Sequence, residues 1–401
     1  MTECSIQSAS NASFFHPSDP IQQQVVFGAG VSVRVGEFAK QLGSHALVIT
    51  DAGVLSAGHP QKIIASLQSA GLKTYLFDGT IENPTDSSIR TCAREVAHLG
   101  IDLIVGVGGG SSLDTAKGTN FILTNGGSMQ DYWGVGKAER PLLPMIAIPT
   151  TAGTGSECQS YALISHDQTH RKMACGDSTV LPKVTLLDPQ LTLSQPFSVC
   201  AATGMDALAH TLESVVCKKR NARSDSHARK GFCLLMQNLN TVWNEPENLD
   251  ARGKVLLGAA HAGAAIERSM LGAAHAMANP LTSHRGVVHG QAVGLTLPAV
   301  LSYNQKDPKV GMVYAQLARE SGLTDSGASD SLAFDILLKK VLYLRKISNL
   351  PTRLSSVGFE PSSIKELSKD AADQWTAGFN PRPVGEPELS RIYQSIDSYA
   401  G

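Results

Sequence analysis

The stretch IDLIVGVGGGSSLDTAKG, residues 101–118, decides the fold of this chain. An apolar run opens into glycines and then into a helical pattern, which predicts a strand, a tight loop and a helix in that order. A ligand could approach the backbone closely at the three glycines, Gly108, Gly109 and Gly110. The amides that open the helix at Ser111 and Ser112 would face an anion, which the helix dipole favours. We therefore predict a pyrophosphate cradle, although Ser111 replaces the third glycine of G-x-G-x-x-G and many strand-to-helix turns look similar.

Two further predicted strands end in polar residues. PMIAIP, residues 144–149, runs into TTAGTGSE, whose hydroxyl groups could bond phosphate or ribose at Thr150, Thr151, Thr154 and Ser156. HALVITD ends in Asp51, whose carboxylate could accept both ribose hydroxyls and would repel a 2′-phosphate, which favours NAD over NADP. In the usual fingerprint the acid follows the glycines by about twenty residues, whereas Asp51 precedes them, so we predict a variant of the Rossmann fold. Asp51 fits a helix N-cap ahead of AGVLSAG nearly as well.

The pattern of apolar residues along the chain changes between Pro189 and Pro196. Before this point, short β-rich runs such as ALVIT and KTYLF alternate with helical stretches such as QKIIASLQSAG, the pattern of parallel βαβ units. After it, long segments with apolar residues three to four apart indicate helices. We therefore predict an N-terminal α/β domain with a parallel, Rossmann-like sheet over residues 21–195, followed by an all-α domain over residues 196–401. The polar opening, residues 1–20, is expected to be a flexible arm.

Four side chains of the second half predict a metal site: Asp206 and His210 in ATGMDALAH, then His275 and His289 in AAHAMANPLTSHRGVVHG. Residues four apart on a helix point from one face about 6 Å apart, which suits two ligands of one ion. Pro280 is expected to end the helix that carries His275, so the last two ligands would converge from two elements. Taken alone, Asp206 and His210 also fit a solvated or capped helical pair.

One carboxylate and three imidazoles form a ligand set without thiolate, which suits Fe²⁺ or Zn²⁺ and argues against a structural, cysteine-rich zinc site. Such a site can keep one coordination position open. A divalent ion with an open position acts as a Lewis acid that holds an alcohol oxygen or polarises a carbonyl. The ligand set therefore predicts chemistry at a C–O centre.

These motifs resemble those of the iron-containing (group III) alcohol dehydrogenases over nearly the whole chain after residue 20. The shared motifs, in the family's order, are GGGSSLDTAK, IPTTAGTGSE, LLDPQLT at 186–192, GMDALAH, the two later histidines and NPRP at 380–383. The resemblance implies a dehydroquinate synthase-like two-domain architecture, a homodimer or larger assembly, and a metal, Fe²⁺ first, bound by Asp206, His210, His275 and His289. It implies cofactor contacts at Gly110, Ser111, Thr150 and Thr151, with Asp51 as the ribose acid and, from shorter matches, Asn83 in ENPT and Lys172 in HRKM.

The chain departs from the family's pattern at two places near the expected metal site. Many members carry a second histidine four residues after the third ligand, often assigned to proton relay, whereas this chain has Asn279. Because Asn279 cannot titrate near neutral pH, a proton would pass through water, the cofactor ribose or another group, with His284, His261 and Tyr161 as unranked candidates. The stretch TSHRG contains Arg285, which could bind an anionic substrate head group or could be a solvated surface arginine.

Composition excludes several function classes. With 401 residues and 42% hydrophobic content, the chain can bury two substantial cores. A net charge of −1 gives no reason to expect nucleic acid or an anionic membrane as a partner. No apolar run approaches the length of a membrane span, and the opening lacks the basic start and apolar centre of a secretion signal. Seven scattered cysteines without CxxC spacing fit reduced thiols, so we expect a cytoplasmic enzyme.

The combined prediction is an NAD(H)- and metal-dependent alcohol dehydrogenase or aldehyde reductase that works in the cleft between its two domains. Hydride would pass between the nicotinamide C4 and a small alcohol or aldehyde, anionic ones included. One alternative is a hydroxyacid–oxoacid transhydrogenase with tightly held NAD, which turnover of free NAD would distinguish. A dehydroquinate synthase-like lyase would need a dense basic pocket for its phosphate substrate, which the sequence does not offer. A non-enzymatic binding module would not need four metal ligands.

Overall fold

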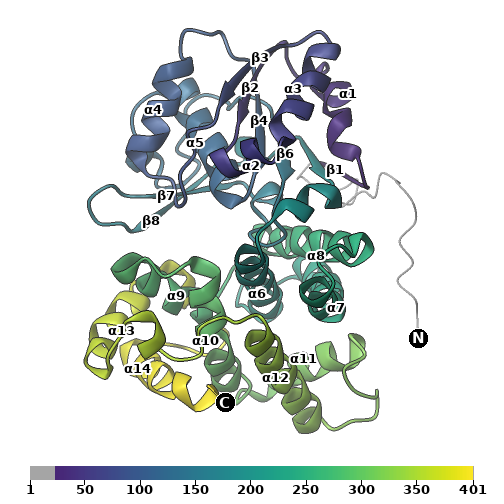
Figure 1. The fold of residues 1–401 in the computed structure, drawn as a ribbon. Coiled ribbons are helices and arrows are strands. Elements are labelled where there is room, and N and C mark those ends of the chain that lie inside the picture. The colour runs from purple at the N-terminus through teal and green to yellow at the C-terminus, as the bar shows by residue number, and fades with distance from the viewer. Residues whose placement is uncertain (1–22, 401) are drawn as a thin grey trace. The chain divides into compact units, whose positions relative to one another are not determined.

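The computed structural model describes residues 23–400, so the arm expected at residues 1–20 lies outside the described residues. The chain divides into two compact units. The α/β unit comprises the described residues up to Thr151 together with Ser156–Gln195. The helical unit comprises Ala152–Gly155 and the residues from Pro196 onward. Figure 1 labels the elements of both units along the chain.

The α/β unit is built on a six-stranded parallel sheet in the order β1-β9-β6-β4-β2-β3. Its strands are β1 (Gln24–Phe27), β2 (His45–Ile49), β3 (Lys73–Phe77), β4 (Leu103–Gly108), β6 (Met145–Pro149) and β9 (Val184–Leu187). Its helices are α1 (Val35–Ala39), α2 (Ala52–Ser56), α3 (His59–Ser69), α4 (Asp86–Val96) and α5 (Gly110–Asn125). All six strands were predicted from their apolar runs, and the parallel α/β fold class is confirmed.

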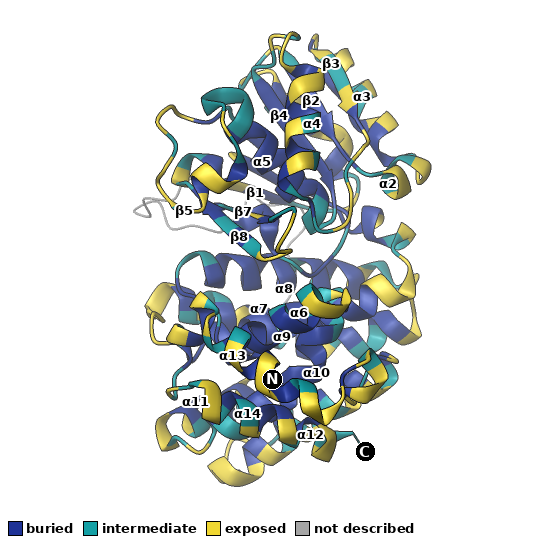
Figure 2. Ribbon diagram, turned by 90° about the vertical axis from the view of Figure 1, so that its left-hand side faces the viewer, coloured by how far each residue is buried: buried dark blue, intermediate teal, exposed yellow. Residues whose placement is uncertain are grey.

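Successive side chains of the central strands point to opposite faces of this sheet and are apolar on both, which explains why helices cover both faces. Val48 and Val105 point into a core with Ile63 of α3, whereas Leu47 and Ile104 point into a second core with α4 and α5. Side chains of successive residues leave a strand on opposite faces, so a strand buried on both sides reads as an unbroken apolar run. Figure 2 shows these strands as largely buried, with helices α3 and α4 exposed on their outer sides.

A second, three-stranded sheet in the order β5-β8-β7 was not predicted from the sequence. It consists of β5 (Gly134–Val135), β7 (Tyr161–Ser165) and β8 (Lys172–Gly176), with β7 antiparallel to β8. A strand of two residues leaves no pattern to detect, and the polar turn between β7 and β8 resembles a loop. This sheet carries Lys172, one of the residues predicted to contact the cofactor.

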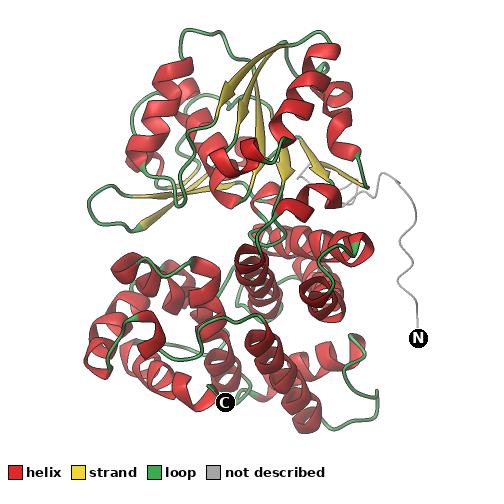
Figure 3. Cartoon of the chain, in the orientation of Figure 1, coloured by secondary structure: helices red, strands yellow, loops and turns green. Residues whose placement is uncertain are grey.

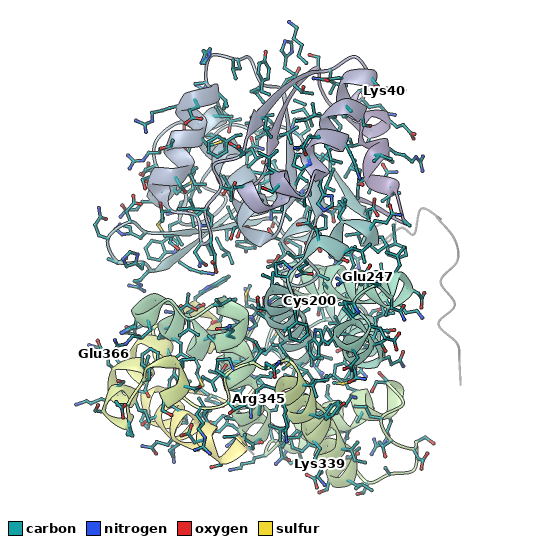
Figure 4. The ribbon with its side chains drawn as sticks, viewed as in Figure 1. Lys40, Cys200, Glu247, Lys339, Arg345 and Glu366 are labelled. Atoms are coloured by element: carbon teal, nitrogen blue, oxygen red, sulfur yellow. The ribbon has the colours of Figure 1, made fainter. Side chains whose placement is uncertain are left out.

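The helical unit contains helices and loops only, within its described residues (Figure 3). The long helices are α6 (Phe197–Ser214), α7 (Ala222–Asn244), α8 (Leu249–Glu267), α9 (Ala273–Arg285), α10 (His289–Asn304), α11 (Pro308–Glu320), α12 (Asp330–Ile347), α13 (Ile364–Ala372) and α14 (Glu386–Ser395). Buried side chains run along nearly all of α6, so α6 lies inside the unit and not on its surface. The core also holds Arg345 of α12, which is 1% exposed and donates to the carbonyl of Tyr399 (Figure 4).

The structure corrects one prediction in this unit, because α9 continues through Pro280. A proline inside a helix removes one backbone hydrogen bond, but its φ of about −65° is itself helical, so burial can outweigh the loss. Pro280 and Leu281 are both buried. The helix ends instead at Gly286, which adopts a left-handed φ of 65° and donates to the Thr282 carbonyl.

No described helix has both the length and the apolar character needed to cross a membrane.

Candidate metal centre and dinucleotide loops

Helix α6 places Asp206 and His210 one turn apart on its buried face. The Oδ1 atom of Asp206 lies 3.4 Å from Nε2 of His210, and the two residues are only 3% and 4% exposed. A solvated helical pair would be open to water, so burial excludes that interpretation.

His275 and His289 reach the same carboxylate oxygen from two other helices. His275 lies in the first turn of α9, with its Nε2 atom 3.3 Å from Asp206 Oδ1. His289 is the first residue of α10, with its Nε2 atom 3.8 Å from the same oxygen. The rings of His210 and His275 are stacked with centroids 4.8 Å apart, and the ring of His289 lies 5.5 Å from that of His275. The structure therefore brings together all four residues singled out from the sequence.

The spacing of these atoms fits ligands that share one ion. Four bonds of about 2.1 Å that point to the corners of a tetrahedron separate neighbouring ligand atoms by about 3.4 Å. Asp206, His210 and His275 offer ligand atoms that all lie within 4.8 Å of one another. The His289 side chain is 25% exposed, against 4–6% for the other three, so it marks the open side of the cluster.

The electrostatics of the cluster favour a bound positive charge. Burial opposes ionisation of Asp206, but the neighbouring His210, His275 and His289 outweigh it and hold the pKa of Asp206 well below its usual range. Burial lowers the pKa of His210 to about 4, so its imidazole is neutral and able to act as a ligand. Burial would also lower the pKa of His275, but Glu213 and Asp206 together raise it to about 9. The two buried carboxylates, Asp206 and Glu213, thus stabilise a positive charge between them. A bound divalent ion can provide that charge in place of a protonated His275.

Sequence reasoning missed Glu213, the second carboxylate of this cluster. It is 3% exposed on α6, and its Oε2 atom lies 2.5 Å from Nδ1 of His275. Glu213 follows Asp206 by seven residues, two helical turns along the same face, so the spacing was visible in the sequence. Its significance depends on the position of His275, which lies on a different helix.

The residues that the sequence suggested for proton relay or substrate binding make contacts with residues other than the four predicted ligands. Asn279, one turn after His275 on α9, donates its side-chain amide to Gln374 Oε1 at 3.0 Å. His284 lies 2.6 Å from Asp370, and His261 lies 2.9 Å from His227 between α7 and α8. The exposed guanidinium of Arg285 sits over the ring of Phe359, and Tyr161 belongs to the small sheet of the α/β unit.

The glycine loop joins β4 to α5 as predicted. Gly108 adopts a φ of 149°, and a side chain there would approach Ser112 to 2.4 Å, so this position requires glycine. Gly109 is the N-cap of α5 without a side-chain cap, and a Cβ atom on it would lie 3.2 Å from Thr151. Gly110 is the first residue of the helix. The start of α5 is thus formed by successive glycines, and no side chain caps its first backbone amides, which suits a phosphate group.

Asp51 and Asn83 lie beside this loop although they are distant from it in sequence. Asp51 Oδ2 accepts a hydrogen bond from Ser112 Oγ at 2.9 Å, and Asp51 Oδ1 caps α2 by accepting from Val54 N at 3.0 Å. Both interpretations of Asp51 therefore fit, since it is an N-cap at the edge of the glycine loop. Asn83, with a left-handed φ of 51°, donates its backbone N–H to Ser111 Oγ at 3.3 Å.

The second loop is fixed by a buried lysine that the sequence analysis did not single out. Thr150 and Thr151 belong to the α/β unit, Thr154 belongs to the short segment assigned to the helical unit, and Lys172 lies on β8. The Lys117 ammonium is fully buried and donates to the carbonyls of Ser156, Gln159 and Tyr161 at 2.6–2.9 Å. It also donates to Ser156 Oγ, which in turn donates to Asp114, so Ser156 lies inside this network.

Comparison with known proteins identifies the family. A model described as "Iron-containing alcohol dehydrogenase" matches residues 22–189, and one described as "Fe-containing alcohol dehydrogenase family, C-terminal" matches residues 200–396. The chain is therefore an oxidoreductase that acts on CH–OH groups, and it belongs to the iron-containing alcohol dehydrogenase family.

Several relatives extend this similarity over nearly the whole chain. The NAD-dependent methanol dehydrogenase of Bacillus methanolicus is 30% identical over 92% of this chain and 97% of its own length. The 1,3-propanediol dehydrogenase of Citrobacter freundii is 32% identical over 92% of this chain and 95% of its own. A crystal structure of 1,3-propanediol oxidoreductase superposes with a TM-score of 0.89 at 31% identity, covering 93% of this chain and 97% of that one. The predicted α/β unit followed by an all-helical unit is confirmed by this likeness.

Proposed function

We propose that this protein is an NAD(H)-dependent alcohol dehydrogenase or aldehyde reductase whose divalent metal, Fe²⁺ first and Zn²⁺ second, is bound by Asp206, His210, His275 and His289. The observation that carries the proposal is the approach of three imidazole nitrogens to one buried carboxylate oxygen at 3.3–3.8 Å. When bound, the metal supplies Lewis-acid chemistry at the oxygen of the substrate. The similarity to the NAD-dependent methanol dehydrogenase supports NAD as the cofactor.

Different residues of the chain bind the cofactor and the metal. The start of α5 at Gly108, Gly109 and Gly110 and the loop at Thr150 and Thr151 receive the cofactor's phosphates, because no side chain caps the first backbone amides of α5. Ser111, Asn83, Thr154 and Lys172 add polar contacts to the cofactor. Asp51 accepts the adenosine-ribose hydroxyls and excludes a 2′-phosphate. We assign the dinucleotide to residues 21–195 and the metal chemistry to residues 196–401.

The substrate is a small alcohol or aldehyde. The methanol dehydrogenase and the 1,3-propanediol dehydrogenase, which are 30% and 32% identical to this chain, support this substrate class. The six described cysteines are free thiols, five of them buried, which supports a reducing compartment such as the cytoplasm.

Metal reconstitution tests this proposal directly. Protein stripped with a chelator is reloaded with Fe²⁺ or Zn²⁺, and NADH consumption is followed with a panel of neutral and anionic aldehydes. We expect no activity without metal, recovery with one molar equivalent of metal, and NADH to be used in preference to NADPH. Activity that survives complete metal removal would contradict the metal-based assignment.

A hydroxyacid–oxoacid transhydrogenase remains the second candidate because of one observation. Asn279 holds the position one turn after His275, and its amide is bonded to Gln374, so no titratable side chain stands there. In a transhydrogenation, oxidation of the hydroxyacid gives a hydride to bound NAD and releases one proton, and reduction of the oxoacid takes up that hydride and one proton. The cycle therefore needs no net proton exchange with solvent. Turnover of free NAD separates the two candidates: a transhydrogenase would interconvert paired substrates while leaving added NADH unconsumed.

A further inference from the structure

We infer that Glu213, supported by Asn380, is a positioning residue that fixes His275 for metal binding. The inference rests on the proposed metal site and deepens it, because it names the groups that orient one of the ligands. Nothing in the four-ligand assignment requires either residue. Both are buried, at 3% and 0% exposed, and both contact the first turn of α9.

Glu213 binds two neighbouring donors of α9 at once. Its Oε2 atom lies 2.5 Å from Nδ1 of His275, and its Oε1 atom accepts from the backbone N–H of Ala274 at 2.7 Å. The carboxylate thereby caps the N-terminus of the helix and holds the imidazole at its start. Because both oxygens are engaged, rotation of the carboxylate would break one bond, so the ring of His275 has one preferred orientation.

Asn380, from the NPRP motif, completes this cap from the far end of the chain. Its Oδ1 atom accepts from the backbone N–H of Ala273 at 3.2 Å and from Asn304 Nδ2 at 3.0 Å. Its Nδ2 atom donates to Asn304 Oδ1 at 2.8 Å. A Cβ atom on Gly272 would lie 2.9 Å from Asn380 Oδ1 and 3.0 Å from Glu213 Oε1, so glycine is what lets both side chains reach the helix start.

The arrangement decides which nitrogen of His275 is free to act as a ligand. A carboxylate accepts and does not donate, so His275 Nδ1 carries the proton and Nε2 presents its lone pair. Nε2 is the atom that faces Asp206 Oδ1. A carboxylate behind a ligating histidine fixes the tautomer and makes the ligand more basic, and its loss typically costs about 10- to 100-fold in metal affinity.

Substitution of Glu213 by glutamine tests the inference with Zn²⁺ as the probe. The amide of Glu213→Gln has one acceptor for two donors, so either Ala274 N–H or His275 loses its partner, or the amide donates to Nδ1 and reverses the tautomer. We expect Zn²⁺ affinity, measured by competition with a chromophoric chelator, to fall by about 10- to 100-fold. Asn380→Asp should give a smaller fall, because it acts on the helix start and not on the ring.

Controls separate positioning from general damage. Glu320→Gln makes the same change at a half-exposed ion pair with Arg229 in the same unit, and should leave Zn²⁺ affinity unchanged. NADH binding by Glu213→Gln should also match the wild type. A folded Glu213→Gln variant with wild-type Zn²⁺ affinity would overturn the inference, while metal-dependent NADH oxidation by the wild type would still stand.

A measurement on the unmodified protein covers the case in which Glu213→Gln does not fold. Nitrogen-15 NMR of the histidine-labelled, Zn²⁺-loaded chain reports the proton on each imidazole nitrogen. We expect His275 to carry its proton on Nδ1, with the downfield proton signal of a short hydrogen bond to a carboxylate. A His275 coordinated through Nδ1, or lacking a proton there, would refute the assignment.

Discussion

The two candidate sites are built from different materials. The glycine loop at the end of β4 is made largely of backbone, since a Cβ atom on Gly108 or Gly109 would come within 3.2 Å of a neighbouring side chain. The metal centre is made of side chains from α6, α9 and α10, packed inside a helical core. Ligand binding at a site made of backbone should be weakened when a side chain is added to it. Ligand binding at a site made of side chains should be weakened when one of them is removed. The predictions below test this contrast.

Removal of one proposed ligand should have the largest effect. In His275→Ala the ion loses a nitrogen donor and Glu213 loses one of its two partners, so metal and activity should disappear together, with kcat/KM at least about 10³-fold lower. Metal analysis and aldehyde-dependent NADH oxidation measure the two quantities. His98→Ala, on an exposed position of the α/β unit, should change neither. Full metal stoichiometry in His275→Ala would remove this residue from the site.

Addition of one methyl group to the glycine loop should have the next largest effect. In Gly108→Ala the new Cβ atom meets Ser112 at a backbone φ of 149° that disfavours side chains, a strain of about 1–3 kcal/mol. We expect NADH affinity, measured by fluorescence titration, to fall by about 10- to 100-fold, with metal content unchanged. Gly327→Ala, where a Cβ atom meets open space, is the control. Loss of metal in Gly108→Ala would break the contrast between the two sites.

Asp51 sharpens the comparison because it is a side chain in the backbone-built site. Asn caps a helix as well as Asp does, so Asp51→Asn keeps the bond to Val54 N. It removes the charge and replaces the oxygen that accepts from Ser112 Oγ by an amide NH₂, which can donate to that hydroxyl. The ratio of kcat/KM for NADPH to that for NADH should rise by about tenfold, equivalent to 1.4 kcal/mol. The melting temperature should stay close to the wild type. An unchanged cofactor ratio would leave Asp51 as an N-cap alone.

The smallest effect concerns the pH dependence of stability in the α/β unit. Burial raises the pKa of Glu157 from 4.5 to about 7, with Lys117 opposing part of the shift. The folded form therefore holds this proton more tightly, and the resulting stability is complete below the unfolded pKa and is lost as pH rises through the folded one. Glu157→Gln should flatten the fall in melting temperature from about pH 5 to about pH 8 by a few degrees.

Glu95→Gln provides the matched control for this measurement. It makes the same substitution at an exposed position on α4, so its melting profile should follow that of the wild type. A Glu157→Gln profile as steep as the wild type would show that another group causes the pH dependence.

The sequence predicted most of the fold because burial on both faces of the sheet leaves continuous apolar runs. The central strands β2, β4, β6 and β9 follow from this pattern, and the edge strands β1 and β3 from short β-rich runs. The helical character of the second half follows from apolar residues spaced three to four apart. The small sheet was missed because β5 has only two residues. The continuation of α9 through Pro280 was missed because local preference disfavours it, while packing in the unit, which the sequence does not display, permits it.

The residues of the two sites were found with unequal completeness. Motif spacing located the four side chains around Asp206, and the structure brings them together, although their role as ligands stays a prediction. Glu213 was missed because its partner is 62 residues away on another helix. Lys117 was missed because lysines are mostly exposed, and only the fold reveals the three carbonyl groups around this one.

The enclosure of Lys117 has a practical consequence for following this protein in solution. Amine-directed acylating reagents need an accessible, unprotonated amine, whereas the side-chain nitrogen of Lys117 is fully buried among acceptors of the segment 156–161. In the native chain it should escape modification while exposed lysines such as Lys40 react (Figure 4). The rate at which Lys117 is labelled, measured by mass spectrometry of its peptide, would then report how often the α/β unit opens by local unfolding. A lower rate with ligand present would show that the ligand stabilises this unit.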